Sequence, residues 1–271
     1  MENTENQVID EAITQIATRC LLVNLRCRHW TGKATDVRVA AGVEQRESAA
    51  TGSTRVTKNL IDMAYINDIR KEAGAARRLI NQFTVPWSSA GGRIAPAEKI
   101  PEFLMEMGVI NEKFDKAVKR LCKDYPVLIR KAQLTLGTMY DPSVYPDAGT
   151  LESRFSLDVA ISEVPTNTDF RFQIPDEVKD ELKYKLRQSI DDSVTDVRDD
   201  LIKRCLAPLQ ALEKKLRTED IKRFSESLVS NIVDTAEQVD QLNMFGNKEV
   251  TIAVRTPVSY THLTLPTICS V

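Results

Sequence analysis

The sequence predicts a mostly helical α+β protein in which long antiparallel helices accompany a small mixed or antiparallel sheet. Two observations predict the helices. Apolar residues recur about every 3.6 positions from Ile100 to Ala132, and again, with interruptions, from Val178 to Leu242, as on one buried face of a helix. A third observation predicts the sheet, because short runs such as 21–29 alternate apolar and polar residues, as half-buried strands do.

Composition indicates a globular protein of the reducing cytoplasm. Of the 271 residues, 42% are hydrophobic and 28% are charged, which suits a chain with a buried core and a wet surface. No apolar run approaches the roughly 20 residues of a membrane span, and the polar start of the chain is no signal peptide. The 5 cysteines are dispersed without CxxC spacing, so we expect free thiols, a cytoplasmic location (the host cytoplasm if a phage encodes the chain) and no membrane partner.

Charge is distributed unevenly along the chain. Counting the printed sequence, residues 55–140 carry 15 basic and 9 acidic side chains, a net of +6, whereas residues 141–243 carry 14 and 22, a net of −8. One explanation is that basic helices around 113–123 pack against acidic helices around 191–200. The other is that the basic segment binds nucleic acid.

We expect an N-terminal α/β part over residues 1–97. Its elements are a helix at 7–19, a strand at 21–29 that ends in the turn Trp30–Lys33, a loop at 34–54, a helix from Ser53 or Thr54 to about Gln82, and a short hairpin at 83–96. Proline and glycine punctuate the hairpin and confine its strands to an edge or an end.

A long-helix region should follow over residues 98–248. Its first helix, 98–137, contains Pro126, where we expect a kink or break, and it should end at Gly137. A second helical region should begin near Pro175, be interrupted at Pro208, restart at 218 and stop near Gly246. Between the two regions, alternation in 155–162 and 169–174 predicts an inserted β-hairpin, with a helix over 151–162 as the alternative to its first strand.

The end of the sequence predicts an interruption of the natural chain. Residues 249–254 alternate like a strand, and we expect 249–257 to be a truncated end. The run VSYTHLTLPT, residues 258–267, resembles the translation of a transposon-based sequencing adapter. We therefore expect residues 258–271 to be read-through from an adapter and exclude them from functional reasoning.

No motif in the sequence predicts catalysis, a cofactor or a metal ion. Once the tail is set aside, His29 is the one histidine, and no base, nucleophile or ligand cluster accompanies it. The run Trp30–Thr35 lacks the first glycine of a phosphate-binding loop, and Cys27 occupies that position. Paired carboxylates such as Asp191–Asp192 lie on helices, where a solvated face explains them.

Two sets of residues are candidates for binding surfaces. The nucleic-acid hypothesis assigns phosphate contacts to nine cations: Arg70, Lys71, Arg77, Arg78, Lys119, Arg120, Lys123, Arg130 and Lys131. The protein-interaction hypothesis assigns a surface to aromatic and basic residues near the turns: Trp30, Lys33, Trp87 and Arg93.

Several segments together resemble a family of bacteriophage and bacterial proteins known as a domain of unknown function. They are Trp30–Lys33, the approach to a helix at Gly52–Lys58, the turn from Val85 to Arg93 and the two long helical regions. Members of that family are often encoded near MoxR-type AAA+ ATPases, so the resemblance implies an accessory role beside such an enzyme. We therefore expect a non-catalytic phage or bacterial protein acting through helical contacts with a partner or with itself. The alternative is a nucleic-acid-binding protein using residues 55–131.

Overall fold

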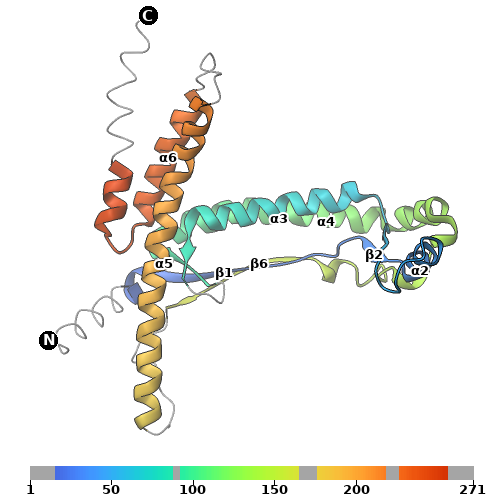
Figure 1. Ribbon diagram of the computed structural model, residues 1–271, viewed down its shortest axis with the longest axis horizontal. Helices are drawn as coiled ribbons and strands as arrows, with labels where there is room; N and C mark the ends of the chain where they lie inside the picture. Colours follow the sequence, from blue (N-terminus) through green and yellow to red (C-terminus); the bar gives the residue numbers. More distant parts are fainter. Residues whose placement is uncertain (1–15, 88–91, 165–175, 218–225, 256–271) are drawn as a thin grey trace, which may run out of the picture. The chain divides into compact units, whose positions relative to one another are not determined.

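The computed structural model describes residues 16–87, 92–164, 176–217 and 226–255 (Figure 1). Contacts divide the chain into two compact units. Unit 1 comprises residues 1–24, 80–103 and 160–271, and unit 2 comprises 25–79 and 104–159. The elements are mostly helical with a small antiparallel sheet, which confirms the predicted fold class. The division into parts at 97/98 stays a prediction.

A four-stranded sheet has the order β4-β5-β1-β6, formed by Val85–Pro86, Arg93–Pro96, Cys20–Arg28 and Ser156–Glu163. Strand β1 pairs antiparallel with β5, with Cys20 opposite Pro96, and β5 pairs with β4 as the predicted hairpin. The first arm of the hairpin predicted at 155–174 is β6, which joins this sheet. Its second arm lies outside the described residues.

The core of unit 1 forms where helices cover the sheet. Helix α5 (Asp176–Arg217) packs against α6 (Glu226–Leu242) and against β4 (Figure 1). Buried side chains from both helices meet side chains of the strands: Cys20, Val85, Trp87 and Ile94 of the sheet region, Val197, Leu201 and Cys205 of α5, and Ala236, Val239 and Leu242 of α6. The predicted apolar stripes thus face one shared core.

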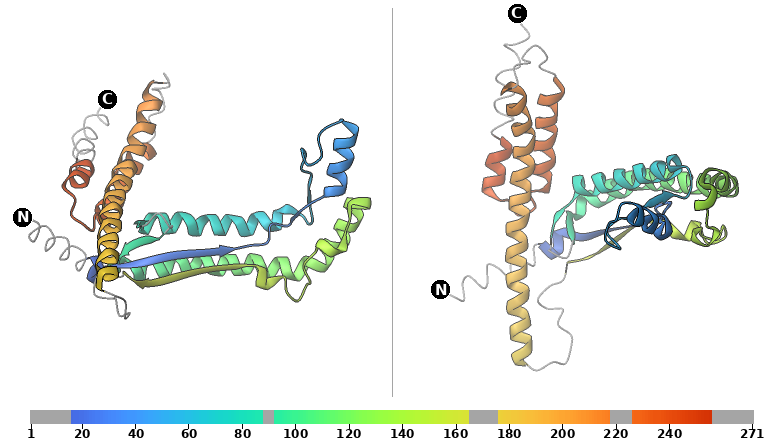
Figure 2. Two further views of the ribbon diagram at one scale, coloured as in Figure 1. Left: turned by 60° about the horizontal axis from the view of Figure 1, so that its bottom comes forward. Right: turned by 45° about the vertical axis from the view of Figure 1, so that its right-hand side comes forward.

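In unit 2, α3 (Met63–Phe83) and α4 (Ile100–Leu136) lie side by side and antiparallel (Figures 1 and 2). Tyr65 donates a hydrogen bond to Asp124 at 2.9 Å, and Arg120 contacts Asp68 at 3.2 Å. Successive residues of α3 therefore contact earlier residues of α4, as in an antiparallel pair. Ile66, Phe114 and Leu121 are almost completely buried. Helix α3 therefore covers the stripe of α4, whereas the expected pairing of residues 113–123 with 191–200 stays a prediction.

The predicted loop at 34–54 was wrong, because it contains helix α2 (Val37–Arg46). Asp36 is the N-cap of α2, and its side chain accepts from the Val39 amide. The helix has no long apolar stripe, and polar contacts hold it: the buried Glu44 carboxylate accepts from the Gly52 and Thr54 amides at 3.0 and 2.9 Å. Periodicity cannot detect a helix held in this way.

The predicted start of the next helix at Ser53 or Thr54 was also wrong. Residues Thr57–Asn59 form β3, which pairs antiparallel with β2 (Lys33–Thr35), and α3 begins only at Met63. Thr54 binds Glu44 rather than capping a helix, and Asp62 Oδ1 accepts from the Ala64 amide at the actual start. We call residues 33–59 the β2–α2–β3 segment.

A close approach explains the turn between β1 and β2. Gly32 has φ +66°, and a Cβ there would lie 2.8 Å from Ile66. The Gly32 carbonyl also accepts from the Leu60 amide at 2.8 Å. Glycine is required here for backbone conformation and packing.

Two prolines lie inside helices that continue through them. Helix α4 ends at Leu136 before Gly137, as predicted, and it does not break at Pro126, although it bends along its C-terminal part (Figure 2). Helix α5 likewise continues through Pro208, so the predicted interruption was wrong. Pro208 is buried on the same face as Leu201 and Cys205, and this packing offsets the missing backbone hydrogen bond.

Short 3-10 helices connect the remaining elements: Ala97–Lys99, Gly137–Met139, Pro142–Val144 and Glu152–Arg154. The strand-like run 249–254 was wrongly predicted, because residues 248–255 are helical and bury Val250 and Val254. The expected helix at 7–19 is described only from residue 16, and the expected helix restart at 218 and the adapter-like residues lie outside the described ranges. None of the described helices combines the length and the apolar character needed to cross a membrane.

Candidate functional site

Four cations form a row on the outer face of α4, which we call the α4 cation row. Lys116, Lys119, Lys123 and Arg130 are all exposed. Their spacing of three, four and seven residues places them on one side of the helix over about 21 Å. In the described part of the chain, none of the four has a carboxylate within ion-pair distance. Three of them are predicted candidates, and Lys116 was missed although its spacing to Lys119 signalled it.

Arg120 differs from these four cations because it already forms an ion pair. Its Nη1 lies 3.2 Å from Asp68 Oδ2, and its guanidinium lies 4.9 Å from the centre of the Tyr65 ring. Arg120 therefore links α4 to α3 rather than joining the row.

The cations predicted on α3 lie on two sides of that helix, and two of them, Arg70 and Arg77, are near His29 at the end of β1. Lys71, Arg77 and Arg78 are exposed, and Arg70 is half-buried. Burial lowers the pKa of His29, and the nearby charges of Arg70 and then Arg77 lower it further. His29 therefore lies beside two arginines and favours its neutral form. The nine predicted cations thus do not form one continuous row.

The four residues of the predicted interaction surface have different surroundings. Trp30 packs edge-on against Tyr125 at 6.1 Å between ring centres, and Lys33 is exposed on β2. In unit 1, Trp87 is buried against Phe245, and Arg93 donates to the Thr84 hydroxyl at 2.6 Å. Both tryptophans therefore contribute to packing within their own units.

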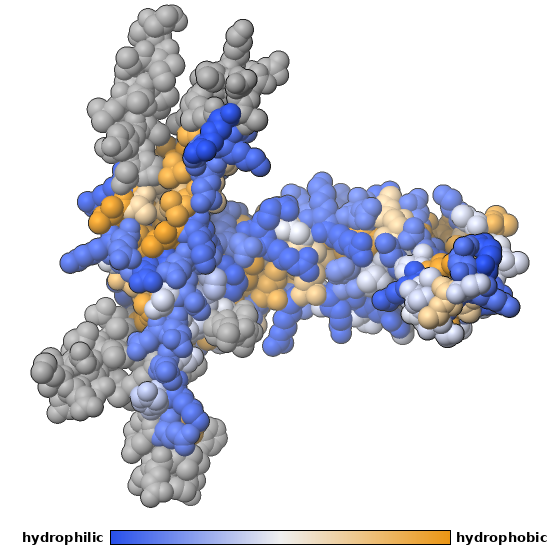
Figure 3. All heavy atoms as spheres, viewed as in Figure 1, coloured by the Kyte–Doolittle hydropathy of each residue, from blue (hydrophilic) through white to orange (hydrophobic). Residues whose placement is uncertain are grey.

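An apolar row that the sequence analysis did not single out lies near the start of α4. Leu104, Met105 and Val109 are 45%, 68% and 49% exposed, and the open Gly108 lies among them. Exposed acidic residues flank this row: Glu106, Glu112 and Glu102, of which Glu102 is already paired with Lys99 at 3.2 Å. Figure 3 shows that hydrophilic residues dominate the visible surface of the helices and that apolar residues form separate patches. The sequence signalled this row by apolar residues, Met105 and Val109, at positions opposite the buried stripe of α4.

A small hollow lies between residues 59–62 and the last turns of α4. It has a volume of about 190 Å³. Its apolar lining residues are buried or half-buried, and its polar ones are exposed; they are Leu60, Ile61, Leu128, Ala132 and Leu136, with Asn59, Asp62, Lys131 and Thr135. The predicted cation Lys131 therefore lies beside β3 rather than in the α4 cation row.

A larger open hollow in unit 1 has a volume of about 550 Å³ and lies between residues 19–20, 96–98 and 240–246. Cys20 is one of its lining residues and donates from Sγ to Met244 Sδ at 3.3 Å. Burial raises the pKa of the Cys20 thiol to about 11, and the nearby Arg19 offsets this only in part. The thiol is therefore protonated at neutral pH and poorly suited to nucleophilic attack.

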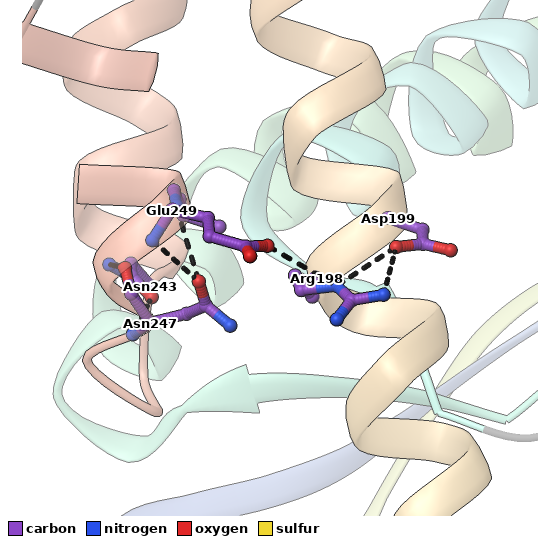
Figure 4. A network of polar contacts seen from close by, with 6 residues as sticks. Arg198, Asp199, Asn243, Asn247 and Glu249 are labelled. Carbon is purple, nitrogen blue, oxygen red and sulfur yellow. Dashed lines mark hydrogen bonds and ion pairs between the residues drawn. The ribbon is translucent and has the colours of Figure 1, made fainter. Parts of the chain in front are cut away.

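Polar contacts in unit 1 join α5 to the chain after α6 (Figure 4). Arg198 donates to Asp199 at 2.9 Å and lies 3.9 Å from Glu249. Asn243 accepts from the Asn247 amide, and Asn247 in turn accepts from the Glu249 amide, each at 2.9 Å. These bonds cap the helical segment 248–255, so they hold the fold together. Among the described residues, no group of three or more His, Cys, Asp or Glu is placed to hold a metal ion.

Comparison with known proteins identifies the family. The model of a family described as "Protein of unknown function (DUF3150)" matches residues 17–239. No curated protein and no solved structure matches the chain. The match covers the sheet, α2 to α5 and most of α6. Because it includes most of the chain, the chain belongs to the DUF3150 family.

Proposed function

We propose that the protein is a non-catalytic accessory protein, of a bacteriophage or a bacterium, that acts in the cytoplasm through contacts of its helices with a protein partner or a second copy. The apolar row Leu104, Met105 and Val109 carries this proposal. Apolar side chains grouped on one exposed helix face favour burial against another chain. The flanking glutamates restrict the choice of partner, because they favour a surface with basic residues.

A MoxR-type AAA+ ATPase is the partner that the family context favours. Such ATPases are often encoded near members of the family that the sequence resembles. The acidic rim of the apolar row supports a contact with a basic face of the ATPase or of another protein. An accessory protein of this kind needs no cofactor or metal of its own.

Size-exclusion chromatography with light scattering tests the proposal. The protein is analysed alone and after co-expression with the ATPase encoded nearest to it. We expect a dimer or larger assembly, or a complex with the ATPase. A strict monomer that does not co-elute with the ATPase would contradict the proposal.

A matched pair of variants locates the contact. Met105→Glu with Val109→Glu places two charges in the apolar row and should abolish the assembly, because buried unpaired charges are costly. Val127→Glu with Leu134→Glu places two charges at other exposed positions of α4, 58% and 86% exposed, and should leave the assembly intact. Equal behaviour of the two double variants would assign the contact to another surface.

Nucleic-acid binding is a second candidate function, and the α4 cation row favours it. Four exposed cations without carboxylate partners in the described chain suit a phosphate backbone. Retention on single-stranded DNA should fall steeply as salt rises, and Lys116→Ala with Lys119→Ala should weaken it. No retention even at low salt would eliminate this candidate.

A further inference from the structure

The two-stranded sheet of β2 and β3 has one inward and one outward face. Its register pairs Lys33 with Asn59, Ala34 with Lys58, and Thr35 with Thr57. Lys58 is buried, whereas Lys33, Thr35, Thr57 and Asn59 are exposed. Because directly opposite residues of an antiparallel pair share a face, these four exposed side chains point the same way.

Arg55 extends this outward face by one more position. It is exposed and lies two residues before Thr57, and its Nη2 donates to the Thr35 hydroxyl at 3.3 Å. The resulting set, which we call the ribbon face, comprises Lys33, Thr35, Arg55, Thr57 and Asn59. It contains two cations, two hydroxyls and one amide but no carboxylate. In the described part of the chain, neither Lys33 nor Arg55 has a carboxylate within ion-pair distance.

The small hollow adjoins the ribbon face, because Asn59 belongs to both. Its lining adds a third cation, Lys131, and one carboxylate, Asp62, both exposed, and Leu128 and Ala132 are among its buried apolar residues. Its volume of about 190 Å³ is below the roughly 300–1,000 Å³ of pockets that enclose drug-sized ligands. A hollow of this size takes one planar ring or one side chain.

We propose that the ribbon face and the adjoining hollow bind single-stranded nucleic acid. Lys33, Arg55 and Lys131 contact phosphates, the hydroxyls and Asn59 donate to backbone or base oxygens, and one unstacked base enters the hollow. A single strand fits better than a duplex, because only an unpaired base can leave the stack without breaking a base pair. This inference rests on the second candidate function and assigns it a site distinct from the α4 cation row.

Fluorescence anisotropy with a fluorescein-labelled 20-nucleotide single strand of mixed sequence tests the inference, with the matching duplex as comparison. The Kd is measured at several salt concentrations for the full chain. Lys33→Gln with Arg55→Gln should weaken binding severalfold and lower the slope of log Kd against log salt by about 1.4, because each lost phosphate contact changes it by about 0.7. Glutamine preserves a hydrogen-bonding side chain at both exposed positions, and circular dichroism checks the fold.

The matched control is Lys203→Gln with Lys248→Gln, which removes two exposed charges from unit 1. It should leave the affinity and the slope unchanged. If the ribbon variant binds like the wild type while Lys116→Ala with Lys119→Ala weakens binding, the inference fails and the second candidate function stands. If the wild type binds no strand at low salt, both fail. Equal affinity for strand and duplex, with no effect of Asn59→Ala, would overturn the role of the hollow.

Discussion

Two parts of unit 2 are stabilised in opposite ways. The α3–α4 pair is held by apolar side chains, since Ile66, Ile69 and Leu121 have no exposed surface. The β2–α2–β3 segment is held by buried polar groups, since Lys58 and Asp36 form an ion pair at 2.9 Å with side chains only 6% and 7% exposed. The first kind of contact tolerates changes of pH and salt, whereas the second depends on charge and on complete hydrogen bonding.

Tyrosines of α4 and of the chain that follows it link the two parts. Tyr125 of α4 donates to the Pro146 carbonyl at 2.9 Å, and Tyr145 donates to the Leu60 carbonyl at 2.8 Å. The ring of Tyr145 also lies 5.4 Å from that of Tyr140. The 137–147 region therefore fastens the end of β3 to the long helix through hydroxyl groups as well as ring contacts.

The largest effect is expected in the apolar part. Leu121→Ala should lower the free energy of unfolding by about 2–5 kcal/mol, because it removes a fully buried side chain and leaves a cavity. Urea unfolding measures the change. The control, Leu134→Ala on the same helix at 86% exposure, should change it by less than about 0.5 kcal/mol. Similar losses in both variants would contradict the assignment of the buried face.

The next effect concerns the buried ion pair of the β2–α2–β3 segment. Lys58 also donates to the Met139 carbonyl at 2.6 Å, so Lys58→Met leaves both that oxygen and Asp36 without a cation. We expect the melting temperature to fall by roughly 5–10 °C. The double variant with Asp36→Asn should recover part of the loss, because the unpaired charge is removed. A double variant no more stable than Lys58→Met would show that charge is not the cause.

The difference between the two parts explains what the sequence could predict. The long helices follow from periodicity, because a stripe from Phe103 to Leu128 needs a continuous helix whatever covers it. Helix α2 does not follow from periodicity. Its stability depends on Asp36, Glu44 and Lys58, whose hydrogen-bond partners are 3 to 81 positions away in the sequence. The ribbon face was missed for the same reason, since only the pairing of β2 with β3 brings Lys33 and Asn59 together. Three of the four residues in the α4 cation row were among the predicted phosphate contacts, because the row depends on spacing within one helix; their binding of phosphate stays a prediction.

Low pH should destabilise the β2–α2–β3 segment before it destabilises the α3–α4 pair. The hydrogen bond from Lys58 lowers the pKa of Asp36, and the bond from the Thr54 amide lowers that of Glu44. Stability from groups with lowered pKa is fully present above their ordinary values of 3.8 and 4.5 and is lost as the pH falls through the lower folded values. Hydrogen exchange, corrected for intrinsic rates, should therefore show α2 losing protection below about pH 4 before α3 does.

A variant provides the control for the acid experiment. Glu44→Gln should reduce the pH dependence of α2 protection, because the titrating group is gone. Glu47→Gln, a change at a 62% exposed side chain, should leave it unaltered. If α2 and α3 lost protection together over the whole pH range, the two parts would unfold as one and the comparison would fail.

The smallest effect on stability is expected from an exposed ion pair between α3 and α4. Arg120 and Asp68 are 62% and 54% exposed, so water screens their attraction, although the Tyr65 ring adds a cation–π contact. Arg120→Ala should therefore lower the free energy of unfolding by only about 0.5–1 kcal/mol. A double-mutant cycle with Asp68→Ala isolates the ion pair, whose coupling should fall further in high salt. A coupling energy of about 3–5 kcal/mol, the size of the loss expected on breaking a buried pair, would mean that burial does not decide how much these ion pairs stabilise unit 2.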